Sequence, residues 1–329
     1  MNKDILDKKH HKQTQKKTNI FVFFKGMAMG AAEVVPGVSG GTIAFITGIY
    51  ERLLNCIKSF DPKLVGIFRK EGIKSVWAAI DGTFLVNLLV GMVIGIGIGV
   101  FGIHHILEYY PIPTWAFFFG LIIASCIYIA RQIKKWTITE IILLVVAGGF
   151  SYWITVLHQG DAPHTLPMVF LAGAIAISAL ILPGVSGSFI LLLMGLYQYI
   201  VTDIVKGALK TLAPEKLLVM AVFALGCLTG LLTFSRVLSW TFKNYRNATL
   251  AALTGFMIGS LNKIWPWRVG DEESKVVKES GEVVYVQFTN YLPNHFPYEN
   301  YFGIAMGAMI FGFAIVFVLD SVHKTTAKD

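Results

Sequence analysis

The residues best suited to chemistry lie in a short motif that occurs twice. Pro36-Gly37-Val38-Ser39-Gly40 returns unchanged as Pro183-Gly184-Val185-Ser186-Gly187, and each copy lies within apolar sequence. Proline and glycine break helices there, so a new helix begins after each motif inside an apolar environment. Free N–H groups, the positive end of the helix dipole and the serine hydroxyl together form an anion site of the kind that holds a phosphate. The alternative is that each break is a structural hinge.

Small and hydroxyl-bearing residues around the two serines complete the predicted anion site. Arg236 is added because it lies near the cytoplasmic end of a later apolar segment, where a guanidinium is suited to guide an anionic headgroup. The predicted substrate-binding residues are Gly37, Ser39, Gly40, Gly41, Thr42, Gly184, Ser186, Gly187, Ser188 and Arg236. We expect no catalytic residue among them.

Glu33 adjoins the first motif, whereas Leu180 stands at the matching position before the second. Charged groups inside a membrane are costly and mark functional positions. A buried carboxyl without a partner takes up a proton readily. Glu33 is therefore the predicted proton-coupling residue, and we interpret Arg52 and Asp81 as anchors at the membrane surface.

The composition is that of a membrane protein with several spans. Of the 329 residues 55% are hydrophobic and 15% are charged, the mean hydropathy is +0.63, and several apolar runs reach the roughly 20 residues that cross a bilayer. The net charge of +8 is concentrated in particular loops and tails, so we expect membrane lipids and no nucleic acid as partners. The three cysteines have no ligand-like spacing, and we predict no disulfide, metal or cofactor.

The predicted topology follows the distribution of lysine and arginine. Residues 1–19 and 320–329 are cytoplasmic tails, residues 20–57 and 166–202 are re-entrant hairpins, and residues 266–300 are an external loop with a small β-hairpin at Val276–Val277 and Val283–Phe288. This arrangement leaves 21 of 28 basic residues in the cytoplasm. The predicted spans are Val76–Phe101, Thr114–Ala130, Ile138–Leu157, Leu217–Trp240, Ala248–Trp265 and Tyr301–Leu319.

An internal repeat accounts for the two motifs. A shift of 147 residues aligns residues 36–57 with 183–204 at 9 of 22 positions, and a shift of 135 aligns Gly91-x-x-x-Gly95 with Gly226-x-x-x-Gly230. Residues 20–157 and 158–319 are then two units, each a hairpin followed by three spans. Because three is odd, the second unit is inverted relative to the first, as in many secondary transporters. The paired glycines are explained by close helix packing.

Three stretches resemble the polyprenyl-phosphate transporter family. They are GMAMGAAEVVPGVSGGTIAFITGIY at Gly26–Tyr50, ILPGVSGSFILLLMGLY at 181–197 and GFMIGSLNKIWPW at 255–267, and the resemblance extends from about Phe21 to Leu319. It implies that the chain is a flippase that moves undecaprenyl phosphate, the lipid carrier of bacterial wall synthesis, from the outer to the cytoplasmic leaflet of the cell membrane for reuse. Oligomeric state is left open.

The charge of this substrate leads to a hypothesis of proton coupling. A phosphate monoester carries about −1.5 to −2 charges, so inward movement against an inside-negative potential costs roughly 3.5 to 4.6 kcal/mol per 100 mV. Protons that travel with the lipid by way of Glu33 remove that cost, while the two hairpins rock to alternate access.

Two other functions fit parts of the pattern. Undecaprenyl-pyrophosphate phosphatases are also inverted-repeat membrane proteins with a Pro-Gly-x-Ser motif, but an arginine follows theirs where Gly40 and Gly187 stand here, and they add clustered glutamates. Without a basic residue to hold the transferring phosphoryl group, this enzyme is the weaker alternative. A small-anion transporter shares the architecture and differs in whether its cavity opens sideways to lipid.

Overall fold

The computed structural model describes residues 19–35, 38–206, 213–277 and 283–326, and they are mostly helical. Four helices are long and apolar enough to cross a membrane, at Gly82–Tyr109, Pro111–Ala130, Ile138–Val156 and Pro214–Asn244. A fifth span is obtained if the bent pair Gly187–Leu193 and Gln198–Val205 is counted as one. The predicted class, an all-α membrane protein with several spans, agrees with this arrangement.

The first half of the chain begins with a helix at residues 19–33 and continues through the first break. After the break come α2 (Gly40–Ile46), α3 (Tyr50–Lys58), α4 (Lys63–Glu71), α5 (Ile73–Ala79), α6 (Gly82–Ile98), the π-helical turn η1 (Gly99–Ile103), α7 (His104–Tyr109), α8 (Pro111–Ala130) and α9 (Ile138–Val156). Pro111 begins α8 at a position where its missing N–H costs nothing. Thr137 and Glu140 form a capping box that begins α9.

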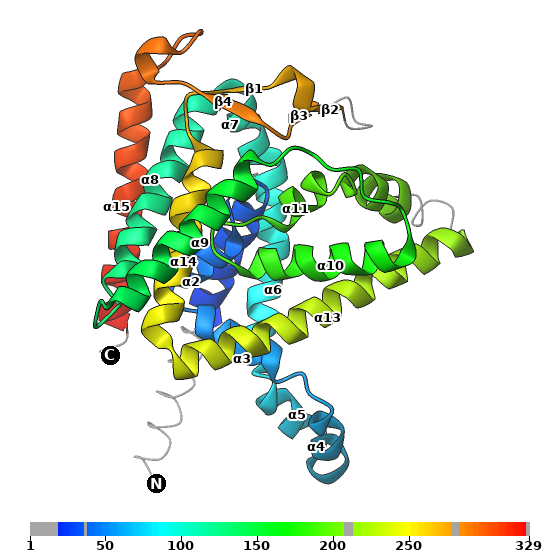
Figure 1. Cartoon of the computed structure of the whole chain (residues 1–329). Helices are drawn as coiled ribbons and strands as arrows, with labels where there is room; N and C mark the ends of the chain where they lie inside the picture. Colours follow the sequence, from blue (N-terminus) through cyan, green and yellow to red (C-terminus); the bar gives the residue numbers. More distant parts are fainter. Residues whose placement is uncertain (1–18, 36–37, 207–212, 278–282, 327–329) are drawn as a thin grey trace.

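The second half follows the same order of a helix, a break and long helices. Its elements are α10 (Leu166–Ile181), α11 (Gly187–Leu193), the π-helical segment η2 (Gln198–Lys206), α13 (Pro214–Asn244), α14 (Arg246–Ser260), η3 (Leu261–Ile264) and α15 (Phe302–Thr326). Figure 1 shows α4, α5 and the end of α15 at one end of the molecule and the strands at the opposite end.

The limits of two predicted spans illustrate how the structure differs from the prediction. The span expected from Val76 begins at Gly82, because Asp81 adopts the left-handed conformation with φ of 50° and separates α5 from α6. That helix then runs through η1 and α7 to Tyr109, beyond the predicted end at Phe101. The span predicted at Ala248–Trp265 corresponds to α14, which has 15 residues and continues as η3.

The segment between α14 and α15 contains short antiparallel strands. β2 (Lys275–Val277) pairs with β3 (Val283–Tyr285), which confirms the predicted hairpin. The second strand of that hairpin ends at Tyr285 rather than Phe288. Phe288 instead begins β4 (Phe288–Asn290), which pairs with β1 (Arg268–Gly270), so Arg268 lies opposite Asn290. Short 3-10 turns flank the strands, η4 (Glu272–Ser274) and η5 (Pro293–His295).

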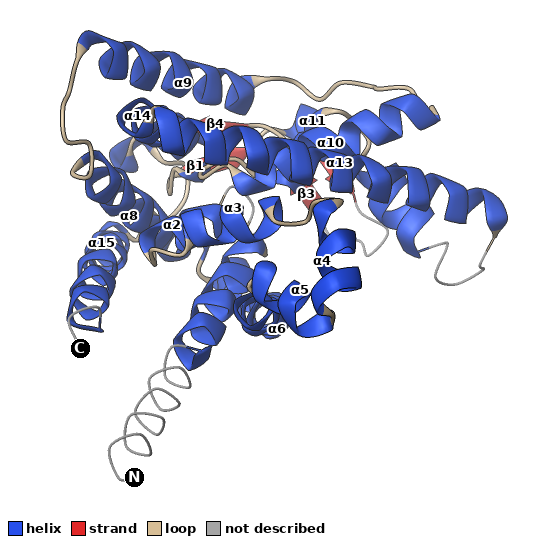
Figure 2. Cartoon of the chain, turned by 90° about the horizontal axis from the view of Figure 1, so that it is seen from below, coloured by secondary structure: helices blue, strands red, loops and turns tan. Residues whose placement is uncertain are grey.

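Glycines bring the long helices into close contact. A Cβ added at Gly91 of α6 would lie 2.1 Å from the Phe23 carbonyl oxygen, and one at Gly226 of α13 would lie 2.1 Å from the Phe170 carbonyl oxygen of α10. The paired glycines therefore allow backbone-to-backbone packing, as predicted. Figures 1 and 2 also show α15 beside α8 and α9 beside α14.

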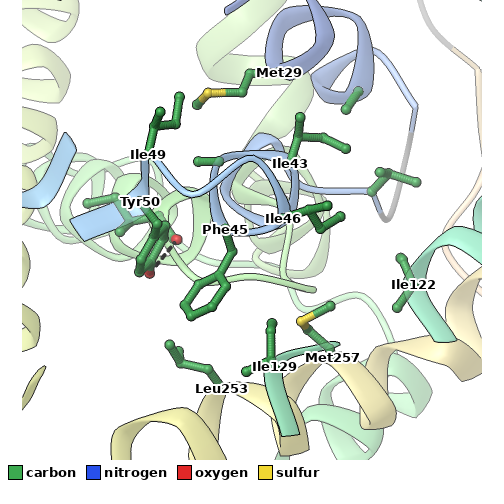
Figure 3. Packing of buried hydrophobic residues seen from close by; sticks show 14 of the residues in the cluster. Met29, Ile43, Phe45, Ile46, Ile49, Tyr50, Ile122, Ile129, Leu253 and Met257 are labelled. Atoms are coloured by element: carbon green, nitrogen blue, oxygen red, sulfur yellow. Dashed lines mark hydrogen bonds between the residues drawn. The ribbon is translucent and has the colours of Figure 1, made fainter. Parts of the chain in front are cut away.

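The core surrounds the first break. All seven residues of α2 are buried, and α2 contacts α8, α10 and α15. Figure 3 shows the Phe45 ring pointing towards Leu253 and Ile129, which come from α14 and α8. The helix that follows the first motif is thus held in the centre of the molecule by elements from both halves of the chain.

Candidate functional site

The first break is organised around Ser39 and Glu33. Ser39 is the N-cap of α2, and its Oγ accepts a hydrogen bond of 3.1 Å from the Gly41 N–H. The Gly40 N–H donates to Glu33 Oε1 at 2.7 Å. A carboxylate of the chain itself therefore lies at the start of α2, where a negative group is favoured. Pro36 and Gly37 lie outside the described residues.

Among the described residues predicted to bind substrate at the first motif, Thr42 has a hydroxyl that forms no hydrogen bond. Its side chain is fully buried, and its Oγ1 has no hydrogen-bond partner within the part of the chain that the structure describes. Buried hydroxyls are normally hydrogen-bonded, because their desolvation is otherwise uncompensated. Thr42 is therefore available to a polar group that enters beside α2.

The first break contacts the chain that leads into the second. Ser39 Oγ lies 3.2 Å from the Leu182 carbonyl oxygen and 3.3 Å from that of Leu180, and Tyr50 Oη donates to the Ile181 carbonyl oxygen at 3.0 Å. A Cβ added at Gly41 would lie 2.6 Å from the same Ile181 oxygen. The structure therefore brings the first motif against the end of α10, immediately before the second motif.

The second break has no acid at the position of Glu33. Gly184 adopts φ of +89°, a conformation that residues with a Cβ rarely take, and Ser186 is the N-cap of α11. Ser186 Oγ and Ser188 Oγ are 2.9 Å apart and share a hydrogen bond. A cavity of about 10 Å³, room for roughly one water molecule, is lined by Ser151, Ile154, Thr155, Gly184, Val185, Ser186, Phe189, Ser260 and Lys263.

Arg236 lies apart from both motifs. Its Nη2 donates to the Phe60 carbonyl oxygen at 3.0 Å and lies 3.8 Å from Asp61 Oδ2, so the side chain holds the loop between α3 and α4. Arg52 and Asp81 form an exposed ion pair with an Nε–Oδ2 distance of 2.7 Å.

Two lysines near the breaks were not among the predicted site residues. Lys25 Nζ donates to the Thr47 carbonyl oxygen at 2.7 Å and so contacts the C-terminal end of α2. Lys263 is only 8% exposed, lines the cavity at the second break and donates to the Val286 carbonyl oxygen. Each is a single lysine in a strongly apolar run, and that isolation is the signal that points to them.

Metal binding has no support in the described part of the chain. It contains no group of three or more histidine, cysteine, aspartate or glutamate residues placed to hold an ion. The chemistry available at the two breaks is therefore that of backbone N–H groups, hydroxyls, one carboxylate and lysine.

Comparison with known proteins gives consistent results. Residues 29–284 match the model of the VCA0040-like family, described as undecaprenyl phosphate translocase-like. A polyprenyl-phosphate transporter of Vibrio cholerae is 45% identical over 274 residues, which cover 83% of this chain and 86% of the relative. One of Staphylococcus aureus is 34% identical over 254 residues, which cover 74% and 84%. No solved structure matches the chain significantly.

These matches distinguish between the classes of function considered above. The family and both relatives carry the names of transporters, so this chain is a transporter rather than an enzyme, and the phosphatase alternative is set aside. Because the family model covers most of the sequence, the chain belongs to the VCA0040-like family of undecaprenyl phosphate translocase-like membrane proteins.

Proposed function

We propose that this protein moves undecaprenyl phosphate from the outer to the cytoplasmic leaflet of the bacterial cell membrane, for reuse in wall synthesis. The observation that carries the proposal is the meeting of two polar helix breaks inside an apolar helical protein. Irregular backbone at membrane depth persists where it is enclosed by protein or faces a polar cavity. The relatives named polyprenyl-phosphate transporter supply the substrate class.

The architecture that we propose for this task is a pair of inverted units, residues 20–157 and 158–319. The packing supports it. In chain order, α8 and α9 of the first unit correspond to α14 and α15 of the second. Because α8 contacts α15 while α9 contacts α14, the two contacts are equivalent under exchange of the units. Within each unit, the first helix contacts the first long helix after the hairpin. Residues 19–33 contact α6 in the first unit, and α10 contacts α13 in the second. The bend of 117° between α11 and η2 fits a hairpin that enters and leaves on the same side.

Substrate binding is proposed at the two motifs. The backbone N–H groups and hydroxyls of the predicted set would contact the phosphate, with the unused Thr42 hydroxyl as the clearest candidate. Arg236, beside the loop between α3 and α4, would act later, where the headgroup leaves on the cytoplasmic side. Both ends of the chain are placed in the cytoplasm by this proposal.

Proton coupling is proposed at Glu33. Its carboxylate accepts the Gly40 N–H at the start of α2, so the charge of Glu33 and the shape of the first break are linked. A proton bound there during inward movement would offset the negative charge of the phosphate, which otherwise opposes transport at roughly 2.3 kcal/mol per charge per 100 mV.

The test uses a probe that binds the headgroup of undecaprenyl phosphate on the surface of intact cells. Deletion of the protein should raise the amount of surface-exposed lipid, and overproduction should lower it. Unchanged surface lipid in both strains would contradict the proposal. Uptake of inorganic phosphate or chloride by proteoliposomes, without lipid movement, would favour a small-anion transporter instead.

A further inference from the structure

Two basic side chains, one buried and one partly buried, lie close together near the second break. Lys263 follows α14 and is 8% exposed, and Arg268 lies on β1 with its Nη1 shielded from solvent. Burial lowers the pKa of Arg268 to about 9, which leaves its guanidinium charged at neutral pH. Both side chains come from the segment that joins α14 to the strands.

Aromatic rings enclose the two charges. The Arg268 guanidinium lies 3.8 Å from the centroid of Trp115 and 4.0 Å from that of Phe288. Lys263 Nζ lies 4.1 Å from the centroid of Phe189 and 4.9 Å from that of Phe288. The Phe288 ring therefore contacts both cations. Ring faces attract cations, but they carry no net charge and leave the pair positive.

The hydrogen-bonding capacity of the pair is largely unused. Among the described residues, neither side chain forms a salt bridge, and Arg268 Nη1 has no hydrogen-bond partner. Lys263 donates to the Val286 carbonyl oxygen, while an ammonium has three donors. Buried charges are normally paired, and two like charges beside one ring repel each other. Within the part of the chain that the structure describes, this cluster has no anionic partner.

The same cluster contacts the second break. Lys263 and Ser186 line one cavity, and Ser186 is hydrogen-bonded to Ser188. Phe189, whose ring lies against Lys263, is the third residue of α11. The Ser186 hydroxyl of the motif and Lys263 of the segment after α14 therefore line the same cavity, and Arg268 lies next to Lys263 across the Phe288 ring. A phosphate monoester, with several acceptor oxygens and up to two negative charges, matches the charge and hydrogen-bonding capacity of these donors, and the cavity must widen beyond the volume of one water molecule to admit it.

We propose that Lys263 and Arg268 form an outer binding site for a phosphate monoester, with the Ser186 hydroxyl beside Lys263 and Ser188 hydrogen-bonded to Ser186. This inference rests on the proposed function for the identity of the ligand, which is the headgroup of the polyprenyl lipid as it enters from the external side. The first break is not equivalent, because Glu33 already supplies a carboxylate there, whereas Leu180 at the matching position leaves the second break to an external anion.

The experiment measures ligand binding to the purified full-length protein in nanodiscs. The test variants are Lys263→Met and Arg268→Gln. A third variant, Lys263→Arg, tests whether a charge alone restores the site. As a matched control, Lys275→Met removes an exposed lysine from the neighbouring strand β2. The probes are undecaprenyl phosphate, undecaprenol, which lacks the phosphate, and inorganic phosphate. Thermal unfolding of each variant identifies any that fail to fold.

The proposal expects Lys263→Met and Arg268→Gln each to weaken binding of undecaprenyl phosphate by about tenfold or more, since each removes a charge-assisted donor. Undecaprenol binding should be unchanged, Lys263→Arg should recover most of the affinity, and Lys275→Met should equal the wild type. If inorganic phosphate competes with the lipid in the wild type and loses affinity in the same two variants, the site recognises the phosphate group itself.

Failure of the two proposals is distinguishable. If folded Lys263→Met and Arg268→Gln bind both phosphate probes as the wild type does, the outer site is wrong and the transport function stands. If the wild type does not bind the lipid, while inorganic phosphate binds in a way that depends on Lys263, the anion site stands and the lipid function is wrong.

Discussion

Glu33 and Leu180 occupy matching positions before the two breaks, and they give the breaks different chemistry. In the first, the carboxylate accepts the Gly40 N–H at 2.7 Å. In the second, a Cβ added at Gly187 would lie 3.4 Å from the Leu180 Cβ, so an apolar group occupies that place. One residue difference therefore gives the first break a carboxylate of its own and, by our inference, leaves the second break to the outer phosphate site.

Glu33→Gln tests the role of the acid. The amide keeps the size of the side chain and an oxygen that can accept from Gly40, but it cannot carry a proton, so transport should become slower and lose its dependence on pH. The measurement is inward movement of undecaprenyl phosphate in proteoliposomes over a pH series. Glu108→Gln, which changes an exposed acid on α7, is the control and should behave as the wild type. Full transport with an unaltered pH profile in Glu33→Gln would refute the proton role.

The recurring motif predicts the helix starts at Ser39 and Ser186, which the structure shows as N-caps, whereas the contacts of single basic residues are harder to predict. The prediction for Arg236 rests on its residue type and depth, whereas its contacts with Phe60 and Asp61 depend on the packing of α13 against α3. The apolar run around Lys263 marks it as unusual, but its contact with Phe189, which precedes it by 74 positions, cannot be read from the sequence. The cluster of Lys263, Arg268 and their aromatic neighbours forms only through tertiary contacts, and the local sequence pattern does not predict such contacts.

At the scale of elements, each break sets one short helix against the helix before it. The glycine that begins α11 has the Ala176 carbonyl oxygen of α10 only 2.5 Å from the position of an added Cβ. That atom belongs to the backbone and has little freedom to move. Any side chain at Gly187 therefore forces α11 away from α10 and opens the second break.

Gly187→Val is expected to abolish transport while the protein still inserts in the membrane, with a loss of stability of roughly 1–3 kcal/mol from overpacking. Gly149→Val is the matched control, because an added Cβ at Gly149 on α9 meets no atom within 4 Å. Transport in proteoliposomes and protein recovered in the membrane fraction are the two measurements. Normal transport by Gly187→Val would show that the break tolerates the displacement.

Helix existence was easier to predict than helix limits. Apolar runs revealed α6, α8, α9 and α13, because hydrocarbon-facing helices must be apolar over their whole length. The start of α6 depends on the left-handed Asp81, and aspartate is one of the few residues that tolerate this conformation without marking it in the sequence. β1 and β4 pair across 17 intervening residues, so neither three-residue strand has a local signal.

For the whole molecule, the distribution of charge predicts which end faces the cytoplasm. Single cysteines at Gly66 on α4 and at Tyr298 in the loop before α15 test this in a variant without Cys56, Cys126 and Cys227. No atom lies within 4 Å of an added Cβ at Gly66, and Tyr298 is 67% exposed, so both positions tolerate the change. A membrane-impermeant maleimide should label Tyr298→Cys in intact cells and Gly66→Cys only after permeabilisation. The reverse pattern would invert the topology and the direction of transport derived from it.

The hydrogen bonds from Ser39 and Tyr50 to the carbonyl oxygens of residues 180–182 have a mechanical consequence. They join the start of α2 and the start of α3 to the end of α10, so a rocking movement of one proposed hairpin past the other would break these hydrogen bonds. We expect the centre to act as a fixed pivot, so that alternating access would come from movement of the outer helices around it. A lipid that crosses would keep its phosphate near this pivot throughout, while the bilayer solvates its chain at every step.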